Sequence, residues 1–159
     1  MQPLPHLYSV AAAGSAEGNL TLTAPGVPPL ISAPPAEFDG PGDQWSPESL
    51  LTAALASCFI LTFRAMARAS RLPWTNLECH VDATLERVEG VTHFTHVVTR
   101  ATLTVPEGTS TVLCERILNK AEEGCLVANS LRSKRELQME IVKASAGDEA
   151  QPATSGQKN

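Results

Sequence analysis

The stretch from Ser46 to Leu61, SPESLLTAALASCFIL, decides the fold because it predicts one long, apolar helix. Ser46 followed by Pro47 and Glu48 supplies an N-cap, a proline at the first helical position and an acid in the first turn. The apolar residues that follow spread around nearly the whole circumference as far as about Ser70. We therefore expect a central helix that is buried on most sides.

Strands are predicted both before and after this helix in the sequence. Between His6 and Ser32, short stretches of Val, Leu and Thr alternate with Gly and Pro, which predicts two or three short strands. After the helix, residues 76–88 predict a half-buried strand, because the odd positions from Leu77 to Leu85 are mostly apolar and the even positions between them are polar. A turn at Glu89-Gly90 leads into a second strand, residues 94–105, and the pair should be antiparallel.

A second helix and a last strand complete the pattern. Apolar residues recur at helical spacing from Leu113 to Ala121, and Gly124 interrupts the helix just before CLVANSL, which resumes as a short helix. Residues 136–142 predict a final strand. The order of elements indicates an α+β fold with antiparallel sheets around a long central helix.

Length and composition limit the possible functions. The chain has 159 residues, and we expect a single domain over residues 1–143 and a disordered tail over residues 144–159. The formal charge of -5 argues against nucleic acid as a partner, because binding phosphates needs concentrated Lys and Arg. The start shows no secretory signal, which makes the cytoplasm the default. The apolar run Leu50–Phe63 is shorter than the about 20 residues that span a bilayer, so we expect no membrane partner.

Four cysteines are the candidate reactive groups, at positions 58, 79, 114 and 125. They form no CxxC pair, which excludes a zinc ribbon and a thioredoxin-type motif. Cys79 and Cys114 lie in the apolar phase of their elements and are interpreted as core residues. Cys58, taken alone, has the same interpretation. Cys125 follows a helix-breaking glycine and opens a helical turn whose N–H groups would stabilise a thiolate, so it is either reactive or merely buried.

The histidines do not predict a metal site. His93 and His96 are three positions apart in a predicted strand, so they should face opposite sides of the sheet. There is also no glycine-rich phosphate loop. We expect no metal and no cofactor, which leaves thiol chemistry.

Two cysteine motifs resemble those of the OsmC/Ohr family of thiol peroxidases, the organic hydroperoxide resistance type. They are SPESLLTAALASCF and, 67 positions after Cys58, GCLVANSL. The order of elements over residues 6–143 is also similar. The resemblance implies an interlocked homodimer in which the long helices pack at the centre, and a role in the oxidative stress response.

The resemblance also implies a role for three residues. Cys58 matches the peroxidatic cysteine, which a peroxide oxidises to a sulfenic acid. Cys125 matches the resolving cysteine, which closes a disulfide that a dithiol reductant of the lipoyl type then reduces. Glu48 matches the active-site glutamate, ten positions before Cys58. The implied substrates are organic hydroperoxides.

One residue of the family pattern is missing, the arginine that pairs with the glutamate and favours the thiolate. Ala16 or Glu37 stands where the two branches of the family place it, and no arginine precedes Arg64. Without a cation, Glu48 close to Cys58 would raise the pKa of the thiol. Loss of catalysis, leaving a protein that binds an apolar ligand or senses oxidation, is therefore the alternative function.

Three arginines are candidates to replace the missing cation. Arg132 follows Cys125 by seven positions, and Arg64 and Arg68 lie on the central helix. For each of them, the interpretation as a solvated surface residue is favoured.

Overall fold

The structure, a computed structural model, describes residues 3–144 and divides into two compact units, residues 1–53 and residues 54–159. Whether the two units act as the single domain expected from the sequence stays a prediction. The predicted disordered tail lies outside the described residues except for Ala144, which ends a strand.

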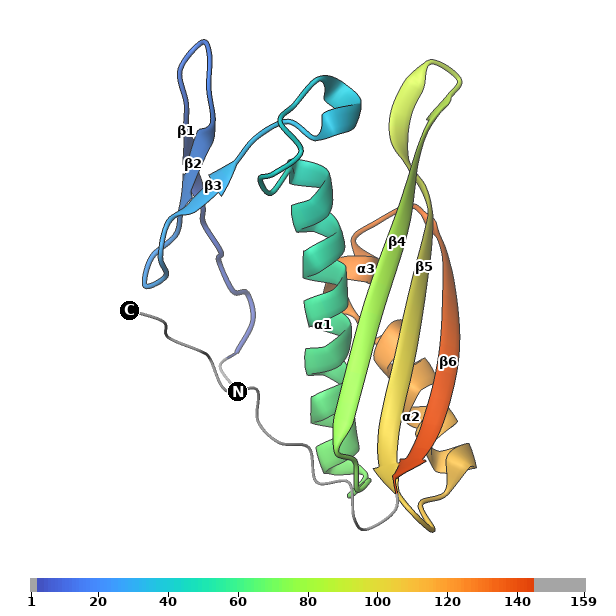
Figure 1. Cartoon of the computed structure of the whole chain (residues 1–159). Helices are drawn as coiled ribbons and strands as arrows, with labels where there is room; N and C mark the ends of the chain where they lie inside the picture. The colour runs from blue at the N-terminus through green and yellow to red at the C-terminus, as the bar shows by residue number, and fades with distance from the viewer. Residues whose placement is uncertain (1–2, 145–159) are drawn as a thin grey trace, which may run out of the picture. The chain divides into compact units, whose positions relative to one another are not determined.

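The first unit contains a small antiparallel sheet. Its strands β1 (Ala11–Ala13), β2 (Leu20–Thr23) and β3 (Leu30–Ser32) pair in chain order (Figure 1). This confirms three short strands before the long helix. A 3-10 turn, η1 (Ala36–Phe38), follows.

The long helix α1 (Pro47–Ala69) begins where its capping residues predict. Ser46 Oγ accepts a hydrogen bond from the backbone N–H of Ser49 at 3.2 Å, and Ser49 Oγ accepts one from the backbone N–H of Ser46 at 2.8 Å. This reciprocal pair satisfies two donors that the first turn leaves free. The start of the helix is therefore set by local side chains.

The burial predicted for α1 is wrong for a single chain. One stripe is buried, comprising Leu55, Phe59, Phe63 and Ala67, whereas Leu61 on another face is 58% exposed. The spacing of four residues explains this, because such residues share one helix face and one sheet can cover only that face. With 23 residues, α1 also meets the length and composition of a membrane span, which buried helices of soluble proteins do as well.

The sheet of the second unit contains three long strands, β4 (Asn76–Val88), β5 (Val91–Pro106) and β6 (Lys134–Ala144). The β4–β5 hairpin turns at Glu89-Gly90, both with positive φ, as the sequence predicts. In contrast to the expected antiparallel sheets, β6 pairs with β5 in parallel. The reason is the helical connection between these strands, which returns the chain to the start of β5.

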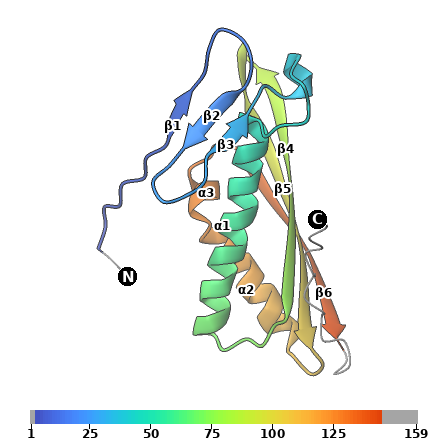
Figure 2. The same cartoon turned by 60° about the vertical axis from the view of Figure 1, so that its left-hand side comes forward.

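Two helices connect β5 to β6, namely α2 (Thr111–Glu123) and α3 (Leu126–Asn129). In Figures 1 and 2, α2 and the portion of α1 after Ala54 lie on the same face of the sheet. Twelve buried residues from these elements and the segment that joins α1 to β4 form the main core: Phe59, Phe63, Ala67, Leu72, Leu77, Ala101, Leu103, Val105, Cys114, Ile117, Leu118 and Ala121. This core fixes α2, and with it the turn that leads into α3.

Candidate active site

Cys58 and Cys125, which are 67 positions apart in the sequence, are in contact in the structure. Cys58 lies at the middle of α1, and Cys125 is the N-cap residue of α3. Their thiols are joined by a hydrogen bond, and both pack in one apolar cluster with Leu55 and Val97. The two free thiols thus share a small, mostly apolar site.

Hydrogen bonds hold the pKa of Cys58 below its ordinary value of 9.0. Burial is the largest single effect and acts in the opposite direction. It is outweighed by four donors together: the backbone N–H of Val127, the thiol of Cys125, the hydroxyl of Thr62 and the backbone N–H of Leu126. Donors of this kind stabilise the charged form of a thiol, so Cys58 is the group that ionises.

Cys125 behaves in the opposite way, because burial raises its pKa to about 11. Its side chain is 1% exposed, and the nearby charges of Cys58 and Glu122 raise the pKa further. The sequence predicts that the turn opened by Cys125 stabilises a thiolate at that residue. Instead, the N–H groups of this turn serve Cys58, while Cys125 keeps its proton and donates it to the Cys58 sulfur.

Glu48 and Cys58 both belong to α1 and are ten positions apart. Ten residues of α-helix correspond to about 15 Å along the axis. Repulsion by Glu48 is not among the causes of the Cys58 pKa within one chain, so the rise expected when Glu48 lies close to Cys58 stays a prediction. One carboxylate oxygen of Glu48, Oε2, is buried and has no hydrogen-bond partner among residues 3–144.

None of the three candidate arginines contributes to the ionisation of Cys58. Within residues 3–144, the groups that lower its pKa are neutral hydrogen-bond donors. Arg64 and Arg68 are exposed on α1. Arg132 is also exposed and lines a separate cavity. The missing arginine is therefore not replaced by another cation in the described part of one chain.

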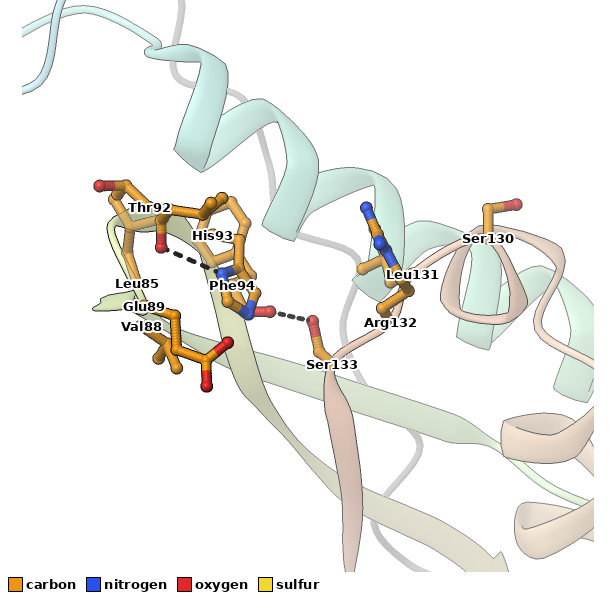
Figure 3. Close-up of a pocket in the computed structure, with 11 residues that line it drawn as sticks. Leu85, Val88, Glu89, Thr92, His93, Phe94, Ser130, Leu131, Arg132 and Ser133 are labelled. Carbon is orange, nitrogen blue, oxygen red and sulfur yellow. Dashed lines mark hydrogen bonds between the residues drawn. The ribbon is translucent and has the colours of Figure 1, made fainter.

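The cavity at Arg132 has a volume of about 650 Å³ and lies between the end of the β4–β5 hairpin and the segment before β6 (Figure 3). The apolar residues of its lining are Leu85, Val88, Val91, Phe94 and Leu131. Ser133 fixes one edge, because its hydroxyl donates to the backbone carbonyl of Phe94 at 2.8 Å. Leu131 also packs against the cluster that contains Cys125.

The other cysteines are not part of the hydrogen-bonded pair. Cys114 is fully buried, and burial raises its pKa. Burial, together with the charges of Glu122 and Cys125, raises the pKa of Cys79 to about 11. Both thiols are therefore protonated at neutral pH.

The histidine prediction is wrong in its geometry. A bulge at Thr95 shifts the register, so that His96 pairs with Thr84 and His93 with Glu86. Because these partners are two positions apart on β4, both histidines are on the same side of the sheet. Even so, residues 3–144 contain no group of three or more His, Cys, Asp or Glu side chains that could hold a metal ion.

Sequence reasoning missed three donors to Cys58. Thr62 had a recognisable signal, since it follows Cys58 by four positions and therefore lies on the same face of α1. The backbone N–H groups of Leu126 and Val127 had none, because any residue except proline supplies them.

Comparisons with known proteins agree with this fold. Residues 40–140 match the family model described as OsmC-like protein. A relative from Bacillus subtilis, the uncharacterized protein YmaD, is 28% identical over 109 residues, which cover 67% of this chain and 73% of the relative.

Solved structures show the same fold. An OsmC-like protein of unknown function from Vibrio cholerae has a TM-score of 0.74 at 22% identity, covering 87% of this chain and 100% of that one. An organic hydroperoxide resistance protein from Elizabethkingia anophelis has a TM-score of 0.72 at 18% identity, covering 91% and 100%. Because the family model spans more than half of the sequence, the chain belongs to the OsmC-like protein family.

Proposed function

We propose that the protein is a cysteine-based peroxidase that reduces organic hydroperoxides. The observation that carries this proposal is the hydrogen-bonded pair of Cys58 and Cys125, whose environments move their pKa values in opposite directions. Such a pair provides a nucleophile and a proton donor at one site. The apolar surroundings favour a substrate with an organic group over hydrogen peroxide.

In the first step, the Cys58 thiolate attacks the terminal peroxide oxygen and the O–O bond breaks. The Cys125 thiol, already donating to Cys58, gives its proton to the alkoxide, which leaves as an alcohol. Cys58 is then a sulfenic acid and Cys125 a thiolate. In the second step, the Cys125 thiolate attacks the Cys58 sulfur, a disulfide forms as the S–O bond breaks, and the hydroxide that leaves takes a proton from solvent to become water.

A dithiol reductant, of the lipoyl type by family resemblance, restores both thiols by exchange. Such a cycle suits a reducing compartment, and we place the protein in the cytoplasm on this ground. It uses no metal and no bound cofactor.

We also propose a homodimer in which Glu48 of one chain approaches Cys58 of the other. Two observations support it. The helix separates these residues within one chain by about 15 Å, and α1 exposes an apolar face at Leu61. Light scattering on the purified protein tests the dimer, and a monomer at micromolar concentration would exclude it.

Stopped-flow reaction of the reduced protein with cumene hydroperoxide tests the peroxidase. We expect fast loss of thiols in the wild type and no such fast loss in Cys58→Ser. In Cys125→Ser we expect the reaction to stop at the sulfenic acid of Cys58. Thiol loss no faster than that of free cysteine would refute the proposal.

The cavity near Arg132 favours one alternative, a protein that binds an apolar ligand and senses oxidation without turnover. Its volume of about 650 Å³ and its lining of five apolar and six polar or charged residues are within the range of small-molecule sites. Stoichiometric oxidation by cumene hydroperoxide that stops after one disulfide, even with dithiothreitol present, would support this alternative. Sustained turnover would exclude it.

A further inference from the structure

The segment that carries Cys125 is held by one arginine of β6. Arg135 Nη1 donates to Oδ1 of Asn129 at 2.9 Å, and Arg135 Nε lies 3.6 Å from Oε1 of Glu122. Glu122 is near the end of α2 and Asn129 is the last residue of α3. Arg135 therefore bridges the two ends of the turn that contains Cys125.

The contacts of Asn129 close the same turn from within. Its backbone N–H donates to the carbonyl of Cys125 at 2.9 Å, and its side-chain Nδ2 donates to the carbonyl of Glu123 at 2.9 Å. Asn129 can make the contact to Glu123 and accept from Arg135 at once, because its amide has both donors and an acceptor. Its orientation is thus fixed from two sides.

This turn supplies three of the four donors to the Cys58 sulfur, namely the backbone N–H groups of Leu126 and Val127 and the thiol of Cys125. A hydrogen bond weakens steeply when its distance or angle changes. Whatever fixes the turn therefore also fixes the environment of Cys58.

We propose that Arg135 is a positioning residue that holds residues 122–129 in the conformation in which they bind the Cys58 thiolate. It acts through the backbone and not through its charge, in a chain that lacks the arginine its family places at the thiolate. The inference rests on the proposed function, because it assigns to Arg135 the role of preparing Cys58 for attack on a peroxide.

Alkylation of Cys58 by iodoacetamide, followed by mass spectrometry as a function of pH, tests this inference without any peroxide. In Arg135→Gln, we expect the midpoint of the alkylation profile to move to higher pH and the rate at pH values well below the midpoint to fall roughly fivefold, the effect of weakening hydrogen bonds to a charged group. Arg116→Gln is the matched control, since it removes the same charge at an exposed position of α2 and should leave the profile unchanged. Arg135→Lys, which keeps the charge but not the planar fork, should lie between wild type and Arg135→Gln.

A structural role alone would lower the unfolding temperature without moving the midpoint of the profile. A folded Arg135→Gln protein with the wild-type midpoint would overturn the proposal. If Arg135→Gln does not fold, Asn129→Ala provides the second test, because it removes the acceptor and leaves Arg135 beside Glu122; the same shift is expected, and its absence overturns the proposal. Failure of peroxide turnover with a shifted profile would refute the peroxidase and leave this inference intact.

Discussion

Replacing Thr62 by valine removes one of the four hydrogen bonds that hold the Cys58 thiolate. The substitution keeps the branched shape of the side chain, and threonine and valine have similar helix propensities, so α1 should not change. The lost interaction is the hydrogen bond that the Thr62 hydroxyl donates to the negatively charged thiolate. We therefore expect the pKa of Cys58 to rise.

The size of the effect follows from the number and kind of donors. A hydrogen bond to a charged group contributes about 1.5–3 kcal/mol, and we take the lower end because Cys58 is partly exposed and water can replace part of it. A loss of about 1.4 kcal/mol decreases the thiolate fraction about tenfold at any pH well below the pKa. At pH values well below the pKa, alkylation of Cys58 should therefore slow about tenfold.

Site-resolved alkylation against pH measures this directly. Thr62→Ser keeps the hydroxyl and should retain most of the wild-type rate. Thr52→Val is the control on the same helix, since the Thr52 hydroxyl donates to the carbonyl of Ser49 at 2.9 Å and does not contact Cys58. A Thr62→Val profile that coincides with the Thr52→Val profile would refute the assignment of the hydroxyl as a thiolate donor.

The pH dependence of the stability of Thr62→Val gives an independent check on the direction of the change in the Cys58 pKa. Because the folded pKa of Cys58 is below 9.0, its ionisation stabilises the native state at pH values above the unfolded pKa. That stabilisation disappears as the pH falls through the folded pKa. The variant should therefore lose more stability, relative to wild type, at alkaline pH than at acidic pH.

Three further outcomes are expected in urea unfolding. Burial raises the pKa of Cys79 to about 11, so the native chain keeps a proton that the unfolded chain loses above about 9; stability should fall across this interval, and Cys79→Ala should make the fall shallower. A Cβ on Gly124 would lie 2.8 Å from Met66 Cε, which is the flexible end of a side chain and can move away, so Gly124→Ala should cost no more than about 1 kcal/mol, and less in a Met66→Ala background; equal costs in both backgrounds would show that this contact is not the cause. Phe63 is 0% exposed, so Phe63→Ala should cost about 3–5 kcal/mol, and a loss below about 1 kcal/mol would contradict its place in the core.

Local signals explain why so much of the fold was predictable. The start of α1 depends on side chains within four residues, and the β4 strand depends on alternation that one face of a sheet enforces. Both elements match their predicted ranges closely, residues 47–69 and residues 76–88. Such features need no knowledge of distant residues.

Non-local features were not predictable in the same way. The parallel pairing of β6 depends on where two helices return the chain, and the bulge at Thr95 depends on how β5 meets its partner. Neither the parallel pairing nor the bulge was predicted from the alternation of apolar and polar residues along its own strand. The histidine geometry was wrong for this reason, because a single extra residue exchanges the faces of a strand.

The role of the missing arginine shows the limit of reasoning from side chains alone. The sequence suggests that a thiolate at Cys58 needs a cation, and the first 53 residues contain no Lys or Arg. Backbone N–H groups also lower the pKa of Cys58, but no side chain in the sequence reveals them. Cys125 adds a hydrogen bond from its thiol, which stays protonated because burial raises its pKa. Ionising one thiol and protecting the other are therefore parts of one arrangement, since the same hydrogen bond lowers the pKa of Cys58 and raises that of Cys125. Within one chain, the pKa of Cys58 is therefore lowered without a cation, by donors most of which belong to the turn after α2.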